Sequence, residues 1–137
     1  MVAPTERLAR FVYEDRHLRL SNWTARDSAF KPMRHQGRLE TSVFRVTGLT
    51  NDAVTDIGQF QRQDKRLLGF ACLAVSEVLQ CGLQVESAEP PPLHAILVGW
   101  PEGDDEDAIQ QRKAIMLQLA SFAGVVAKAT TDPTAGT

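Results

Sequence analysis

Apolar and polar residues alternate with period two in several short stretches of the chain, a pattern typical of β-strands. We expect strands over residues 8–14, 41–48, 83–87 and 93–100, where this alternation is clearest. The stretch 67–75, LLGFACLAV, is apolar on both faces and therefore predicts a strand in the middle of a sheet.

Helical spacing of apolar residues is clearest over 102–128, which begins with an acidic run that suits the positive end of a helix dipole. A second helix is expected over 49–66, capped by Thr50 or Asn51. Gly58 reduces the helix propensity of this segment by about 1 kcal/mol relative to alanine. It indicates either an irregular helix or a neighbour packed closely against it.

Residues 15–40 are polar, basic and irregular, and they predict a long loop in which Trp23 and Phe30 serve as anchors. A loop of this length is unusual in a compact domain unless it carries function.

Together these elements predict an α+β fold. We expect a single mixed or mostly antiparallel sheet of about five strands, packed against the long C-terminal helix and one or two shorter helices on one face. The spacing does not suit regular βαβ repeats. The predicted domain covers residues 1–128, and 129–137 form a flexible C-terminal tail.

The cysteine content and the lengths of the apolar runs indicate the cellular compartment. The 137 residues include two cysteines, Cys72 and Cys81, without a Cys-x-x-Cys pair, which argues against a disulfide framework and a thiolate zinc site. There is no apolar leader at the N-terminus, and no apolar run approaches the ~20 residues that cross a bilayer. We therefore expect a cytoplasmic protein that does not bind membranes.

The net charge of −2 conceals an asymmetry between the two halves of the chain. Residues 1–66 contain twelve Lys/Arg against eight Asp/Glu, whereas residues 67–137 contain three against nine. Either the first half binds an anionic partner, or the two halves pack together and pair their charges.

The common nucleotide, dinucleotide, metalloprotease and hydrolase motifs are missing from the sequence. The acidic run 102–107 lacks the spacing of a calcium loop. We therefore assign no catalytic residue and expect no metal and no cofactor, and whether the protein is an enzyme stays open.

Cations and imidazoles supply the candidate ligand-binding residues. Arg45, in a predicted strand, would pair with an acid of the second half or face a pocket and contact an anion. His94 would either pack at the head of its strand beside Ile96, Val98 and Trp100, with one ring nitrogen bonded to a carbonyl, or act in acid–base chemistry or phosphate binding. The basic 30–38 loop beside Phe30 suits phosphate contact with base stacking, or a solvated surface. The full set is Arg10, His17, Lys31, Arg34, His35, Arg45 and His94.

The last predicted helix is apolar around most of its circumference once Leu117, Phe122 and Val125 are counted. Such a helix is deeply buried or covered by a partner. These three residues are therefore the candidate interaction surface, for another protein or a second copy of the chain.

Four sequence pieces spanning residues 10–101 resemble a group of small bacterial proteins without an established activity. The pieces are RFVYEDRHLR, AFKP with SVFRVTGL, LLGFACLAV with GLQVE, and HAILVGWP. The resemblance implies a bacterial, mobile-element or defence context and supplies no catalytic residues.

A looser likeness links Arg10, Thr41–Ser42 and Glu86 to ADP-ribosyltransferase-type folds, but the paired Glu-x-Glu or Gln-x-Glu of those folds is absent.

Two hypotheses remain. The first is a small non-enzymatic accessory or adaptor module that acts through protein–protein contacts in a bacterial multi-gene system. The alternative is a nucleotide- or nucleic-acid-binding domain, or a divergent ADP-ribosyltransferase-like enzyme, that uses Arg45, His94 and the basic 30–38 loop. Convergence of Arg45, His94 and His17 in one pocket would favour the alternative, whereas scattering of these residues or their pairing with acids would favour the first hypothesis.

Overall fold

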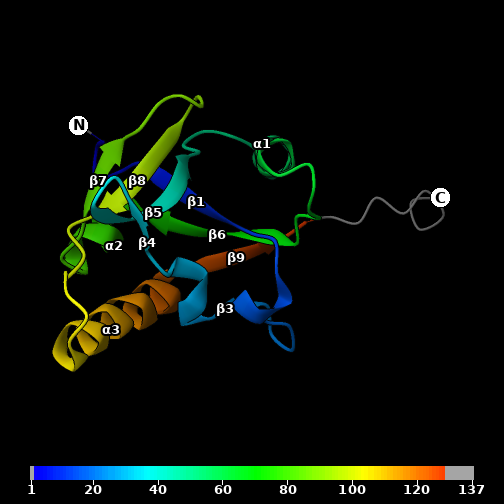
Figure 1. The fold of residues 1–137 in the computed structure, drawn as a ribbon. Helices are drawn as coiled ribbons and strands as arrows, with labels where there is room; N and C mark the ends of the chain where they lie inside the picture. Colours follow the sequence, from blue (N-terminus) through cyan, green and yellow to red (C-terminus); the bar gives the residue numbers. More distant parts are fainter. Residues whose placement is uncertain (1, 129–137) are drawn as a thin grey trace, which may run out of the picture.

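An antiparallel sheet forms the centre of the fold in the computed structural model, which describes residues 2–128 (Figure 1). The predicted tail, 129–137, lies outside the described residues. Six strands follow the order β7-β8-β5-β1-β6-β9, and β4 also pairs with β5 to complete a seven-stranded sheet. Their bounds are β1 Arg7–Val12, β4 Met33–His35, β5 Arg38–Arg45, β6 Gly69–Ala74, β7 Gln84–Ser87, β8 His94–Val98 and β9 Gly124–Ala127.

Three α-helices accompany the sheet within the described residues: α1 Asn51–Gln61, α2 Val75–Gln80 and α3 Glu106–Phe122. The predicted α+β class is confirmed, with an antiparallel sheet and a long C-terminal helix. Thr50 caps α1 by accepting from the Ala53 N–H (3.2 Å), and Asp105 caps α3 by accepting from the Ala108 N–H (3.1 Å).

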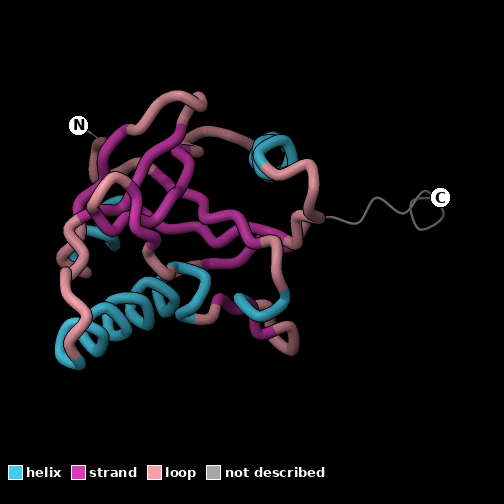
Figure 2. The backbone as a smooth tube through the Cα atoms, in the orientation of Figure 1, coloured by secondary structure: helices cyan, strands magenta, loops and turns pink. Residues whose placement is uncertain are grey.

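Hydrophobic clusters cover both faces of the sheet. One face packs against α2 and α3 through residues that include Val78 and Leu119. The other packs against α1, where Val54 contacts a cluster that contains Phe11, Phe44 and Phe70. Figures 1 and 2 show α3 along one side of the sheet and α1 on the other. The expectation that all helices lie on one face is therefore wrong.

The region 15–40 is built from short elements rather than from one long loop. Phe30 is fully buried, as an anchor requires, whereas Trp23 is 42% exposed. The elements are the 3-10 turns η1 Asp15–His17 and η2 Asp27–Phe30, the two-stranded ladder of β2 Leu18–Arg19 with β3 Thr24–Ala25, and the hairpin of β4 with β5. Runs of two to four residues are too short to leave a periodic signal in the sequence.

The end of the chain corrects a second expectation. The last helix ends at Phe122 and not at Lys128, and β9 then pairs with β6 in the register Phe70↔Val126. β-branched Val125 and Val126 suit a strand, and they point to opposite faces, Val125 to the α3 side and Val126 to the α1 side. β9 thereby gives β6 a neighbour on each side, as its doubly apolar sequence predicted.

Two smaller differences concern element ends. The helix predicted to reach Arg66 ends at Gln61, and Phe60 near its end is 71% exposed. Trp100 packs with the α3-side cluster rather than on the face of His94, because β8 ends at Val98 and Gly99 turns the chain with a φ of +91°.

Candidate functional site

The strands β1 and β5 separate in the middle of the sheet. They pair only at Leu8↔Arg45 and Ala9↔Phe44, after which β1 continues beside β6 alone. On the same edge of β5, β4 pairs with the beginning of the strand. The backbone of Ser42 faces the opening between β1 and β4, because its polar groups lie on the same edge as those of Phe44.

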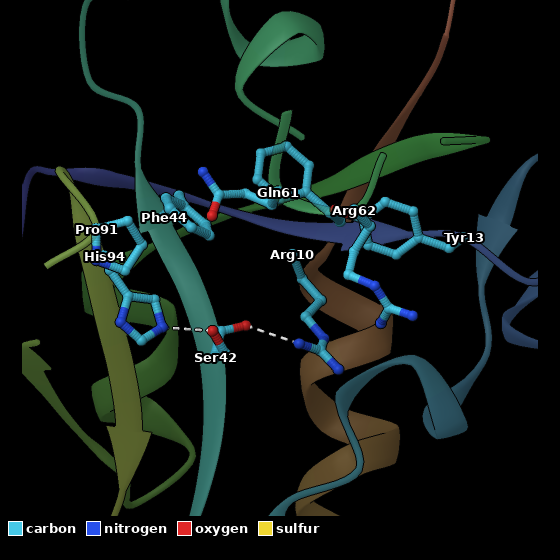
Figure 3. Close-up of a pocket in the computed structure, with 9 residues that line it drawn as sticks. Arg10, Tyr13, Ser42, Phe44, Gln61, Arg62, Pro91 and His94 are labelled. Atoms are coloured by element: carbon cyan, nitrogen blue, oxygen red, sulfur yellow. Dashed lines mark hydrogen bonds between the residues drawn. The ribbon is translucent and has the colours of Figure 1, made fainter. Parts of the chain in front are cut away.

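A cavity of about 310 Å³ occupies this opening on the α1 side. Nine residues line it, and Figure 3 shows those it labels around the opening, from β1, β5, β8, the end of α1 and the loops that flank β1 and β8. Among these residues are guanidinium, imidazole, hydroxyl, amide and aromatic groups, but no carboxylate. The residues are Arg10, Phe11, Tyr13, Ser42, Phe44, Gln61, Arg62, Pro91 and His94.

Arg10 replaces the missing strand pairing. Its Nη1 donates to the Ser42 carbonyl (2.8 Å) and its Nε donates to the Ala29 carbonyl (2.9 Å). Burial lowers the pKa of Arg10, but an arginine remains charged at neutral pH. The remaining N–H groups of this guanidinium have no partner among residues 2–128, so Arg10 places positive charge and donors at the cavity.

Ser42 and His94 form a hydrogen-bonded pair across β5 and β8. The Ser42 Oγ lies 2.5 Å from the His94 Nε2, and the His94 Nδ1 lies 2.9 Å from the Ala88 carbonyl oxygen. The imidazole also packs on the Phe44 ring, with centroids 5.3 Å apart. The predicted carbonyl contact of His94 is confirmed, and the hydroxyl partner is an addition that the sequence did not indicate.

The end of α1 forms the opposite wall. The guanidinium of Arg62 lies 5.8 Å from the centre of the Tyr13 ring and pairs with Asp64 (3.2 Å). The hydrogen bond from Arg62 lowers the pKa of Asp64. Burial raises the pKa of Tyr13, whose hydroxyl donates to the Gly58 carbonyl at 2.7 Å, so this phenol stays neutral.

Gly58 brings α1 close enough to build this wall. A Cβ at this position would lie 2.5 Å from the Phe11 ring and 3.0 Å from Leu67. We expect Gly58→Ala to lower the free energy of unfolding by up to about 2 kcal/mol, because overpacking costs about 1–3 kcal/mol and the gain in helix propensity offsets roughly 1 kcal/mol of it. Urea denaturation measures the change.

Asp56→Ala, at an exposed position of the same helix, is the control and should change stability by less than about 0.5 kcal/mol. A Gly58→Ala protein more stable than the wild type would show that Phe11 yields at no cost.

The candidate ligand-binding residues do not all meet here. Arg10 and His94 line the cavity, but Arg45 pairs with Glu6 of the N-terminal segment (2.9 Å) rather than with an acid of the second half. Burial raises the pKa of Glu6, but hydrogen bonds from the Ala3 N–H and Arg45 lower it overall.

His17 also lies outside the cavity. Its Nδ1 contacts the Ser28 Oγ at 3.0 Å and its Nε2 lies 3.5 Å from Glu14. Burial lowers its pKa, with a further contribution from Arg16. Arg45, His94 and His17 therefore do not converge.

The basic 30–38 loop lines part of a second cavity, of about 520 Å³, beside α3. Lys31 and Arg34 line it, and Arg34 pairs with Glu102 (3.1 Å). His35 is exposed on the β4 hairpin. Arg34–Glu102 and Arg38–Glu86 (3.1 Å) link the basic and acidic halves, whereas the other ion pairs of the described residues stay within the first half.

The three residues of the candidate interaction surface have different environments. Leu117 is 47% exposed on α3, whereas Phe122 and Val125 are partly buried against the α3-side cluster, and Val125 belongs to β9. The apolar run at the end of the predicted helix thus contributes mainly to the core of the protein.

Sequence reasoning missed Tyr13, Gln61 and Arg62 as site residues, and it considered Ser42 only through the ADP-ribosyltransferase likeness. The alternation of β5 did place Ser42 on the face of Phe44. Its hydrogen bond to a residue 52 positions away has no local signal.

Comparisons with known proteins returned no match to any family profile, curated protein or solved structure. Within residues 2–128, three or more His, Cys, Asp or Glu side chains nowhere gather as metal ligands would. None of the helices in that part of the chain combines the length and apolar character needed to cross a bilayer.

Proposed function

We propose that the protein binds a small anionic molecule with a flat ring, of the size of a mononucleotide, in the cavity between β1 and β5. The observation that carries this proposal is the cavity's lining, in which two guanidiniums and three aromatic rings occur without a carboxylate. Arginine guanidiniums suit phosphate and carboxylate groups, and aromatic rings suit planar ligands.

The size of the cavity supports a small ligand. Its volume of about 310 Å³ is at the lower end of the roughly 300–1,000 Å³ range of small-molecule sites. A nucleic-acid strand needs a basic groove that follows several phosphates. Lys31 and Arg34, which would extend such a groove, lie in the cavity beside α3. The arrangement therefore favours a mononucleotide over a nucleic acid.

Isothermal titration calorimetry with AMP, CMP, GMP, UMP, adenosine and inorganic phosphate tests this function. We expect at least one monophosphate to bind more tightly than adenosine, with an affinity that falls as salt screens the arginines. Arg62→Gln should weaken the binding of that monophosphate by about tenfold or more, since a hydrogen bond to a charged group contributes roughly 1.5–3 kcal/mol.

Arg66→Gln is the matched control, because Arg66 is exposed and lies outside the cavity lining. An equal loss of affinity in both variants would reveal a general charge effect. Absence of heat for every monophosphate would contradict the proposal.

The accessory role expected from the sequence stays a prediction. Two of its three surface residues, Phe122 and Val125, pack partly against the core, which reduces the apolar area offered to a partner. The ADP-ribosyltransferase alternative gains nothing from the cavity, because Glu86 pairs with Arg38 outside its lining.

A further inference from the structure

Hydrogen-bond partners at both ring nitrogens define the tautomer of the neutral His94 imidazole. Ser42 lies opposite Ile96 and Phe44 lies opposite His94, so the serine and the histidine are diagonal neighbours on one face of the sheet. The Ala88 carbonyl can only accept a hydrogen bond, so the His94 Nδ1 at 2.9 Å carries the proton. In the neutral ring the Nε2 is then an acceptor, and the Ser42 hydroxyl donates to it.

A hydroxyl that donates to an imidazole, which is itself oriented by a third group, is the arrangement of an activated nucleophile. We propose that Ser42 is a catalytic nucleophile and His94 its general base, in the hydrolysis of small carboxylic esters that carry a negative charge. The preference for a charged ester rests on the proposed anion-binding function, because the same cavity with its arginines would hold the substrate.

The reaction needs only the ester and water. The Ser42 Oγ attacks the ester carbonyl carbon while its proton passes to the His94 Nε2. Collapse of the tetrahedral intermediate breaks the bond to the alkoxide, which takes the proton from Nε2 and leaves as an alcohol. Water then attacks the acyl-serine, with His94 again accepting the proton and returning it to Ser42, and the carboxylic acid departs.

Arg10 supplies positive charge and donors that would stabilise the oxyanion of such a reaction. Its guanidinium is held against the Ser42 carbonyl at 2.8 Å by a contact that leaves other N–H groups for a ligand. Donors fixed in advance beside a nucleophile stabilise the developing oxyanion more than mobile water does. The bond to the Ala29 carbonyl keeps this guanidinium in place.

The chain before β8 holds His94 in position. Leu93 has a φ of +69°, a left-handed conformation that is unfavourable for a leucine. It is held there by a 2.7 Å hydrogen bond from its N–H to the Glu89 carboxylate, and the Ala88 N–H donates to the His94 carbonyl at 2.9 Å. Backbone strain of this kind persists where surrounding contacts fix a functional group.

The test uses the full-length protein with p-nitrophenyl acetate and the mono-p-nitrophenyl ester of succinic acid, followed by intact-mass analysis and peptide mapping with a fluorophosphonate probe. We expect stoichiometric labelling at Ser42 and faster release of p-nitrophenol from the charged ester. Ser42→Ala should abolish both. His94→Gln should slow turnover by about 100-fold or more while retaining the fold by circular dichroism, since general-base catalysis contributes roughly that factor.

Ser28→Ala is the matched control, because Ser28 also contacts a histidine, His17, but lies outside the cavity. It should leave labelling and turnover unchanged. Labelling that persists in Ser42→Ala, or turnover of wild type no faster than the buffer, would overturn the catalytic assignment even if monophosphates bind. Ser42-dependent hydrolysis that is equal for both esters would support catalysis and refute the anion preference.

Discussion

Replacement of Phe30 by alanine should lower the free energy of unfolding by about 3–5 kcal/mol, the range found for buried phenylalanines. Phe30 is fully buried in the cluster between the sheet and α3, which also contains Leu119. Its carbonyl accepts a hydrogen bond from the buried Thr41 hydroxyl at 3.0 Å, which ties η2 to β5. Urea denaturation followed by circular dichroism gives the change.

Trp23→Ala is the matched control from the same segment. Trp23 is 42% exposed, so we expect a loss of less than about 1 kcal/mol, as is usual for surface positions. A Phe30→Ala protein that loses no more stability than Trp23→Ala would show that 15–40 folds independently of the core.

The second large effect should come from Gly69→Ala in β6. A Cβ at Gly69 would lie 2.5 Å from the Val126 carbonyl oxygen and 3.1 Å from the Ala127 Cα. Because these are backbone atoms of a paired strand, they cannot turn aside as a side chain can. We expect a loss of about 2–3 kcal/mol and faster amide exchange in β9, measured by hydrogen–deuterium exchange mass spectrometry.

Gly124→Ala tests the same ladder from its other strand. Gly124 lies opposite Cys72, and a Cβ there would meet no atom within 4 Å. The free energy of unfolding of Gly124→Ala and its amide exchange in β9 should match those of the wild type. Unchanged protection of β9 in Gly69→Ala would mean that the pairing of β6 with β9 tolerates a side chain between the strands.

The site was only partly accessible from the sequence, and particular residues show why. His94 stood out as a polar residue at the head of an apolar strand, and its carbonyl contact could be anticipated. Ser42 did not stand out, because a single serine in a strand is ordinary. The register of β5 against β8 brings the two together, and register depends on the hydrophobic pattern of whole strands and on the turns that join them.

For Arg45 the sequence indicated the kind of contact correctly but not the partner. An arginine in an apolar strand indicated a buried pair or a ligand contact, and the alternation of β5 correctly placed it beside Val43 and away from Phe44. Its partner, Glu6, comes from the N-terminal segment, where no pattern in the sequence marked a contact.

The sequence by itself determined the α+β class, the central strand and the positions of most long elements, and it narrowed the cap of α1 to Thr50 or Asn51, because each follows from periodicity or from chemistry within a few residues. Only the tertiary structure decided that β9 follows α3, that β1 leaves β5 after Ala9, and that Arg10 occupies the resulting gap. These features depend on backbone groups that find partners far along the chain. The hydrogen bonds of these backbone groups form only in the assembled sheet, so no local sequence pattern marks them.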